Sequence, residues 1–364
     1  MHTIRDHNRK TGVLCLFAVI LLSASGCGTG GSPLAWPPAP PAPGLARILS
    51  GHTLWVSSIA WSPDGKMIAS GSGDTTLKVW DVASGSNLKS LTLDRGSLAS
   101  VAWSPNGEYL AVGHNEPSDR VRIWDMATWQ PVLLMNPKGA MRVVSYSPDG
   151  EMLAVGLGFA DPDPKHKPKG SGAAIYDART GAELVTLYLP EDVISLAWSP
   201  DSKYLAFRAS VTDPAASPTD LGYVMIWDLS GALKRSNAND LSNPDRLRRL
   251  DGLNGKSNVD WSPDGKLVAA GDGDELKFVD TSTWTETPAL TGSPDGAGHI
   301  AWSPNGKWLA LGGSPSVEIW DVAKQKQVST FPLFDAVNDI KWSPDSKFLA
   351  TGSEDHYVRI WEVK

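Results

Sequence analysis

The residues best suited to chemistry are two acids and a histidine that lie close together. Asp161, Asp163 and His166 fall within one short segment, and carboxylates with an imidazole are common ligands of divalent metal ions. Prolines beside the acids and three nearby lysines argue against that use, so we expect no metal and no cofactor. The sequence also contains no Gly-rich phosphate loop, Gly-x-Ser-x-Gly elbow or cysteine cluster, which disfavours an enzyme.

The elements that position every side chain are set by a repeated motif, Trp61–Lys66 (WSPDGK). Six further copies begin at Trp103, Tyr146, Trp198, Trp261, Trp302 and Trp342. Within the motif Pro63 presets φ, Asp64 bonds nearby backbone and Gly65 accepts a positive φ, so the motif predicts a tight turn between two strands. The fourth and seventh copies have serine in place of this glycine, which predicts slightly strained or differently shaped turns there.

Each copy is followed by a β-rich segment that ends in an aromatic residue and an acid, such as Leu77–Asp81, and most have a fourth short strand. A period near 40 residues with four strands per copy predicts an all-β fold, a seven-bladed β-propeller of four-stranded antiparallel blades. The chain stops just after a third strand, at Lys364. We therefore expect residues 46–50 to supply the missing outer strand, so that an N-terminal strand closes the last blade.

The first copy carries four residues with a distinctive spacing: His52 after a glycine, Ser70, Asp74 and Trp80. With these residues the stretch 45–364 resembles the WD40-repeat proteins, and the resemblance implies that the four form a structural hydrogen-bond network. Other copies depart from the pattern: none has a matching Gly-His, and Val279 stands where tryptophan is expected. The Ser-Pro-Asp-Gly repeats also resemble the periplasmic TolB-like propellers.

Polar residues concentrate in the innermost strands of the last three copies. They stand one or three positions before the repeated aromatic residue and are Asn258, Asp260, His299, Asp339 and Lys341. The first four copies have small or apolar residues there. Buried charges need partners, so an internal network of ion pairs and water is one reading. The alternative is a polar pocket at the channel mouth that holds a ligand or a partner's side chain.

Two copies have about ten extra residues between the second and third strands. The insertions carry Asp161, Asp163 and His166 in the third copy, and Asp213 and Asp220 in the fourth. Insertions in repeat proteins form loops, often on the binding face, so these residues are candidate partner contacts. A neutral insertion stays open, because loop length costs little free energy.

The N-terminus has the order of a bacterial export signal. A basic start leads into the apolar run Val13–Leu22 and then into small residues that end at Cys27. This resembles a bacterial lipobox, which implies a signal peptide over 1–27, a lipid on Cys27 and a location in the bacterial cell envelope. Residues 28–44 form a Gly- and Pro-rich linker. A conventional cleaved signal and an uncleaved anchor stay open.

The net charge of −7 disfavours a general nucleic-acid-binding surface. We therefore expect a monomeric, non-catalytic scaffold, tethered to the envelope, that binds a protein partner through propeller face loops. Two alternatives remain: a TolB-like periplasmic assembly factor, and a propeller hydrolase or lyase that acts on an envelope polymer.

Overall fold

The structure is a computed structural model that describes residues 42–93, 96–114, 121–158, 171–210, 222–230, 246–250, 253, 257–271, 276–290, 298–313 and 316–364. The chain divides into the units Met1–Pro40 and Pro41–Lys364, and all described residues lie in the second. The predicted signal and Cys27 lie outside the described residues, as do Asp161, Asp163, His166, Asp213 and Asp220. Lipidation of Cys27 stays a prediction. The described residues contain no helix with the length and apolarity needed to span a bilayer.

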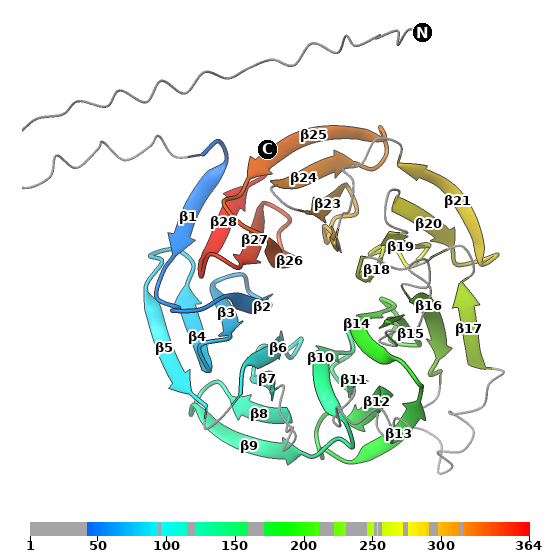
Figure 1. Cartoon of the computed structure of the whole chain (residues 1–364), viewed down its shortest axis with the longest axis horizontal. Coiled ribbons are helices and arrows are strands. Elements are labelled where there is room, and N and C mark those ends of the chain that lie inside the picture. The colour runs from blue at the N-terminus through cyan, green and yellow to red at the C-terminus, as the bar shows by residue number, and fades with distance from the viewer. Residues whose placement is uncertain are drawn as a thin grey trace, which may run out of the picture. The chain divides into compact units, whose positions relative to one another are not determined.

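Seven four-stranded antiparallel sheets form a ring, which confirms the predicted propeller (Figure 1). Blades one to three are β2 (Val56–Trp61), β3 (Met67–Ser72), β4 (Thr76–Asp81) and β5 (Asn87–Thr92); β6 (Leu98–Trp103), β7 (Tyr109–His114), β8 (Val121–Asp125) and β9 (Gln130–Met135); and β10 (Ala140–Tyr146), β11 (Met152–Gly158), β12 (Gly172–Asp177) and β13 (Glu183–Tyr188).

Blades four to six are β14 (Asp192–Trp198), β15 (Tyr204–Ser210), β16 (Tyr223–Asp228) and β17 (Leu247–Leu250); β18 (Val259–Trp261), β19 (Leu267–Gly271), β20 (Leu276–Asp280) and β21 (Thr285–Leu290); and β22 (His299–Trp302), β23 (Trp308–Gly312), β24 (Ser316–Asp321) and β25 (Lys326–Pro332). Blade seven is β26 (Val337–Trp342), β27 (Phe348–Ser353), β28 (Val358–Glu362) and β1 (Leu45–Leu49).

The last blade is closed as predicted. Strand β1 pairs antiparallel with β28, so Leu49 lies opposite Val358 and Leu45 opposite Trp361. Figure 1 shows β1 on the outer side of β28, beside the C-terminus. The pairing covers the free edge of β28 and ties the start of the ring to its end, which leaves neither strand as an open template for aggregation.

The repeated motif forms the same turn in every blade. In the first copy Ser62 Oγ bonds Asp64 Oδ1 at 2.7 Å and the N–H of Met67 donates to Ser62 Oγ at 2.8 Å. Gly65 has a φ of 70°, and the serines that replace it keep this conformation, with φ of 59° at Ser202 and 61° at Ser346. The two non-glycine turns are therefore strained but not differently shaped.

The apolar core lies between blades. Second strands such as β11 are buried along their whole length, whereas in outer strands such as β5 the side chains are exposed or half-buried. One cluster joins Ile175 of blade three to Phe207 of blade four, and another joins Ile59 of blade one to Ile360 of blade seven. Each blade thus buries both of its faces against neighbours.

Antiparallel order divides the connections between the two faces of the ring. The connections from first to second and from third to fourth strands lie on one face, which we call the turn face because it carries the Ser-Pro-Asp-Gly turns. The connections from second to third strands and from each blade to the next lie on the other face, which we call the loop face. Both predicted insertions lie outside the described residues.

Candidate functional site

The four residues singled out in blade one lie together in a continuous hydrogen-bond network. His52 Nδ1 is 3.0 Å from Asp74 Oδ2, and His52 Nε2 is 2.7 Å from Ser70 Oγ. The indole N–H of Trp80 donates to the same Ser70 Oγ at 2.8 Å. The network therefore joins the loop before β2 to strands β3 and β4 of its own blade.

Ser70, His52 and Asp74 follow the order of a Ser-His-Asp triad, in which histidine activates a serine hydroxyl. Ser70 is fully buried, however, and its Oγ already accepts the indole N–H of Trp80. A substrate carbonyl has no approach to this oxygen. The arrangement consequently positions β-strands rather than a nucleophile.

The charges of this network are also arranged for structure. Burial alone would raise the pKa of Asp74, but hydrogen bonds from Thr76 and from the N–H of Thr53, with the nearby His52, hold it at about 2. Burial lowers the pKa of His52, against the attraction of Asp74. A neutral imidazole and an ionised carboxylate therefore coexist near neutral pH.

The polar residues of blades five to seven line the central channel, a cavity of about 660 Å³ between the innermost strands. The channel wall includes the five predicted residues Asn258, Asp260, His299, Asp339 and Lys341. The structure thus brings these five together, and hydrogen bonds show what most of them do.

Three of the five bond the backbone of a neighbouring inner strand. The N–H of Ile300 donates to Asn258 Oδ1 at 2.5 Å, and that of Trp302 to Asp260 Oδ2 at 2.7 Å. Across the junction of blades seven and one, the N–H of Ile59 donates to Asp339 Oδ2 at 2.9 Å. These side chains hold blade against blade through backbone bonds, a role that the predicted network of ion pairs and water did not include.

The serines three positions before the repeated aromatic residue in blades one, two and four also accept backbone bonds from the next blade, whereas blade three has Val143 there. The N–H of Val101 donates to Ser58 Oγ at 3.2 Å, and the N–H of Val259 to Ser195 Oγ at the same distance. Ser100 accepts from the next blade in the same way. Position three before the aromatic residue is therefore an acceptor for the next blade, and the last blades fill it with larger groups.

The channel also contains a charged side chain, Lys341, that forms an ion pair. Lys341 Nζ lies 3.3 Å from Asp339 Oδ1, and this carboxylate raises the pKa of Lys341. Burial raises the pKa of Asp260 to about 6, although the N–H of Trp302 and Lys341 oppose the shift. Burial also lowers the pKa of His299. Within the described residues no group of three or more His, Cys, Asp or Glu side chains is placed to hold a metal ion.

Sequence reasoning missed Arg208, which adds a positive charge to the surroundings of His299. Burial depresses the pKa of the Arg208 guanidinium to about 10. The signal was present in the alignment of copies, because every other blade has glycine at this position of its second strand, as at Gly71 and Gly352.

The repeated aromatic residue has a role that its turn does not reveal. In four blades its indole N–H donates to a carbonyl of the preceding blade: Trp61 to Lys341 O at 3.0 Å, Trp103 to Ala60 O at 3.2 Å, Trp198 to Ser145 O at 3.1 Å and Trp342 to Ala301 O at 2.9 Å. This contact, which we call the indole clasp, stitches consecutive blades together around the channel. The indole N–H groups of Trp261 and Trp302 have no partner among the described residues.

The fold and its internal network define a seven-bladed repeat propeller, and the comparisons with known proteins agree. The family model "WD domain, G-beta repeat" matches residues 44–81, 284–321 and 325–362, and the model "Eukaryotic translation initiation factor eIF2A" matches 73–243. The chain carries WD40 repeats. Each matched WD40 segment begins at an outer strand and ends at the third strand of the next blade, the same stagger that leaves β1 to close the ring.

Curated relatives match over single repeats or pairs of repeats. The chain is 48% identical over 42 residues to the pre-mRNA-splicing factor prp46 of Aspergillus fumigatus, covering 12% of this chain and 9% of the relative. It is 37% identical over 84 residues to the small ribosomal subunit protein RACK1 of Medicago sativa, covering 23% and 25%. With protein Mut11 of Chlamydomonas reinhardtii it shares 42% over 60 residues, covering 15% and 16%. The chain thus spans a quarter or less of these relatives.

These findings overturn one expectation. The predicted location in a bacterial cell envelope is wrong, because the matched relatives are eukaryotic and include a splicing factor and a ribosomal subunit protein. The secondary resemblance to TolB-like propellers gains no support from these matches. A WD40 propeller suited to protein interaction is the coarser conclusion that holds.

Proposed function

We propose that this propeller is a non-catalytic scaffold that binds a protein partner through its loop face. The WD40 repeats and the names of the relatives support a role in protein assemblies. The polar groups of the channel support it as well, since three of the five predicted residues bond the backbone of a neighbouring inner strand rather than point at one open position.

The observation that carries the proposal is an aromatic patch where blades seven and one meet on the loop face. Phe334 is 85% exposed, and Leu54, Trp55 and Tyr357 are each close to 40% exposed. Asn338 Nδ2 joins the two blades beside these residues, because it donates both to Val56 O at 3.1 Å and to Glu354 Oε1 at 2.9 Å. Exposed apolar patches with polar borders mark protein-binding surfaces.

The patch is held rigid from below by Arg359. Its guanidinium lies 5.5 Å from the Phe334 ring centroid and 5.3 Å from that of Tyr357, and it pairs with Asp355 at 2.7 Å. A buried, paired arginine beside two aromatic rings favours the positions that they take before a partner binds. Preformed aromatic anchors of this kind provide most of the binding energy at protein interfaces.

Charge indicates the chemistry of the partner. The exposed acids Asp335 and Glu354 border the patch, and the chain is acidic overall. The complementary surface is a segment with apolar side chains flanked by lysine or arginine.

Affinity purification of the full chain from its own cells, with Phe334→Ser beside the wild type, tests this function. Tyr188→Ser is the matched control, because Tyr188 is a 54% exposed aromatic residue on the outer strand β13. We expect a specific set of proteins to be retained by the wild type and the control and lost from Phe334→Ser. Identical sets from all three proteins would remove the patch as the binding surface.

A further inference from the structure

A position that recurs on the turn face, at the end of the turn between the third and fourth strands, borders the groove between two blades. The turn between the third and fourth strands ends in a residue with positive φ, and these residues are Gly85, Trp129, Gly181, Trp284 and Gln325. Three of them stand beside residues of the preceding blade: Gly85 beside Arg47, Gly181 beside Leu133 and Met135, and Trp284 beside Tyr204. This position therefore decides what fills the groove between two blades.

In the groove between blades four and five the chain inserts its own indole. Trp284 lies edge-on to Tyr204, with ring centroids 6.0 Å apart, and edge-on to Trp261 at 6.3 Å. The remaining cavity is about 320 Å³. Aromatic rings favour such edge-to-face arrangements, so this groove shows how an indole seats at a blade junction.

Two other grooves are also occupied by the chain itself. Between blades one and two, Trp129 packs against the local core and Lys89 Nζ lies 5.8 Å from its ring centroid. Between blades seven and one, the Arg47 side chain crosses the groove and donates to the carbonyls of Ser84 and Ala83.

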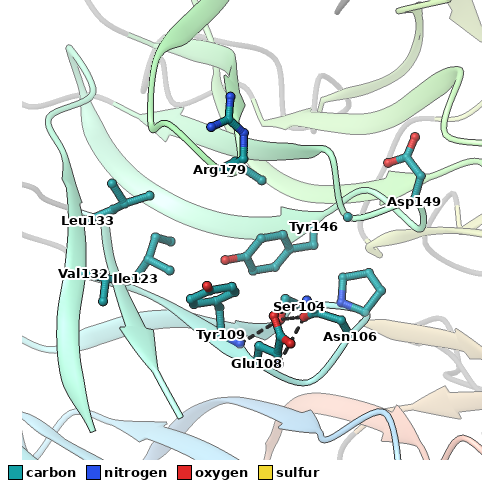
Figure 2. Close-up of a pocket in the computed structure, with 13 residues that line it drawn as sticks. Ser104, Asn106, Glu108, Tyr109, Ile123, Val132, Leu133, Tyr146, Asp149 and Arg179 are labelled. Atoms are coloured by element: carbon teal, nitrogen blue, oxygen red, sulfur yellow. Dashed lines mark hydrogen bonds between the residues drawn. The ribbon is translucent and has the colours of Figure 1, made fainter. Parts of the chain in front are cut away.

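The groove between blades two and three has similar walls to the groove between blades four and five, but it lacks the indole that Trp284 inserts there. Tyr109 and Tyr146 stand where Tyr204 and Trp261 stand in the other groove, and Gly181 replaces Trp284. Figure 2 shows the two phenol rings beside the apolar wall of Ile123, Val132 and Leu133. The cavity measures about 530 Å³, and none of the residues that the structure describes fills it as Trp284 does.

The Tyr146 hydroxyl is a buried polar group that a ligand in this groove could satisfy. Tyr146 is 9% exposed, and its hydroxyl has no hydrogen-bond partner among the described residues. At the same repeat position, four tryptophans form the indole clasp, whereas the indole N–H groups of Trp261 and Trp302 have no partner among the described residues either. The Tyr146 hydroxyl lies in the cavity near Tyr109 (Figure 2). A buried hydroxyl without a partner is costly, and a ligand N–H would satisfy it.

We propose that the groove between blades two and three binds a tryptophan side chain of a partner protein. The indole takes the place that Trp284 occupies in its own groove, and its N–H donates to the Tyr146 hydroxyl oxygen. The exposed Arg179 at the rim covers the outer ring face, as Lys89 does over Trp129. The site rests on the proposed protein-binding function but lies on the turn face, opposite the Phe334 patch.

Fluorine NMR of the peptide acetyl-Gly-Ser-(5-fluoro-Trp)-Ser-Gly-amide with the full chain tests the site. Gly181→Trp should fill the groove and weaken peptide binding at least tenfold. The variant should fold, because a Cβ at position 181 meets nothing closer than 3.7 Å and Trp284 adopts a φ of 59° at the equivalent position. Tyr146→Phe should weaken binding about fivefold through loss of one hydrogen bond. Phe334→Ser should leave the signal unchanged, which separates this site from the loop-face function.

Several results would overturn the assignment. One is an unaltered fluorine signal with the wild-type chain, and another is full binding by a Gly181→Trp protein with wild-type circular dichroism. If Gly181→Trp does not fold, Tyr146→Phe decides, and an unchanged affinity counts against the site. N-acetyl-tryptophan amide that binds as tightly as the peptide would show that the groove takes a free aromatic compound rather than a partner's side chain.

Discussion

Replacing Ser70 by alanine tests the network of blade one most directly. The hydroxyl of Ser70 is shared by two buried groups, the indole N–H of Trp80 at 2.8 Å and His52 Nε2 at 2.7 Å. Alanine leaves both without a partner in a fully buried place. Each such loss costs about 1–3 kcal/mol, so we expect Ser70→Ala to lower the free energy of unfolding by about 2–6 kcal/mol.

Urea unfolding followed by circular dichroism measures this loss as a shift of the midpoint at constant slope. Blade seven provides the matched control, since among the described residues Thr351 Oγ1 bonds one group, the indole N–H of Trp361, at 3.1 Å. Thr351→Val should therefore cost about half as much. The double variant of Ser70→Ala with Trp80→Phe should recover part of the cost as a coupling energy. A Ser70→Ala protein within about 0.5 kcal/mol of the wild type would refute the argument.

Three further changes give separate tests. Ser202→Gly should change the free energy of unfolding in urea by less than about 1 kcal/mol, because it relieves the strain of a positive φ but loses the bond from Asp149 N–H (3.1 Å). Ser202→Ala loses the bond and keeps the strain, so it should be less stable than both other proteins, and an alanine variant more stable than the glycine variant would contradict this. Deleting residues 45–50 should lower the melting temperature by about 5 °C or more, since it removes the buried Leu49 and reopens an edge, and an unchanged melt would contradict ring closure. Asp260 has a folded pKa of about 6, above its unfolded value of about 3.9, so its stabilising contribution is present below pH 4 and is lost as pH rises through 6. Over that range the wild type should lose about 3 kcal/mol of stability relative to Asp260→Asn, and a difference that does not change with pH would refute the shift.

The fold was predictable because its signals are local. Ser62, Asp64 and Gly65 make their turn through bonds that span no more than five residues, so one motif repeated seven times fixes the blades. Ring closure followed from a count of strands. The positive φ at Ser202 was also predictable, because Ser202 stands at the turn position where most other copies have a glycine with positive φ.

The channel was harder to predict because its bonds join residues far apart in the chain. The sequence separated the small residues of the first blades from the polar residues of the last ones, yet Ser58 and Asn258 accept equivalent backbone bonds from the next blade. The bond from Trp61 to Lys341 O joins positions 280 residues apart. Only the closed ring brings such residues together, so no local pattern reveals them.

The groove of blades two and three depends on two departures from the repeat that act together. Tyrosine at position 146 removes the indole clasp, and glycine at position 181 removes the plug that Trp284 provides elsewhere. Together they leave a buried hydroxyl without a partner beside an open cavity, at a cost of about 1–3 kcal/mol in a fold whose net stability is only about 5–15 kcal/mol. Local rules are broken in this way mainly at sites where function compensates, and here the missing indole defines the shape, the polarity and the identity of the group that would compensate.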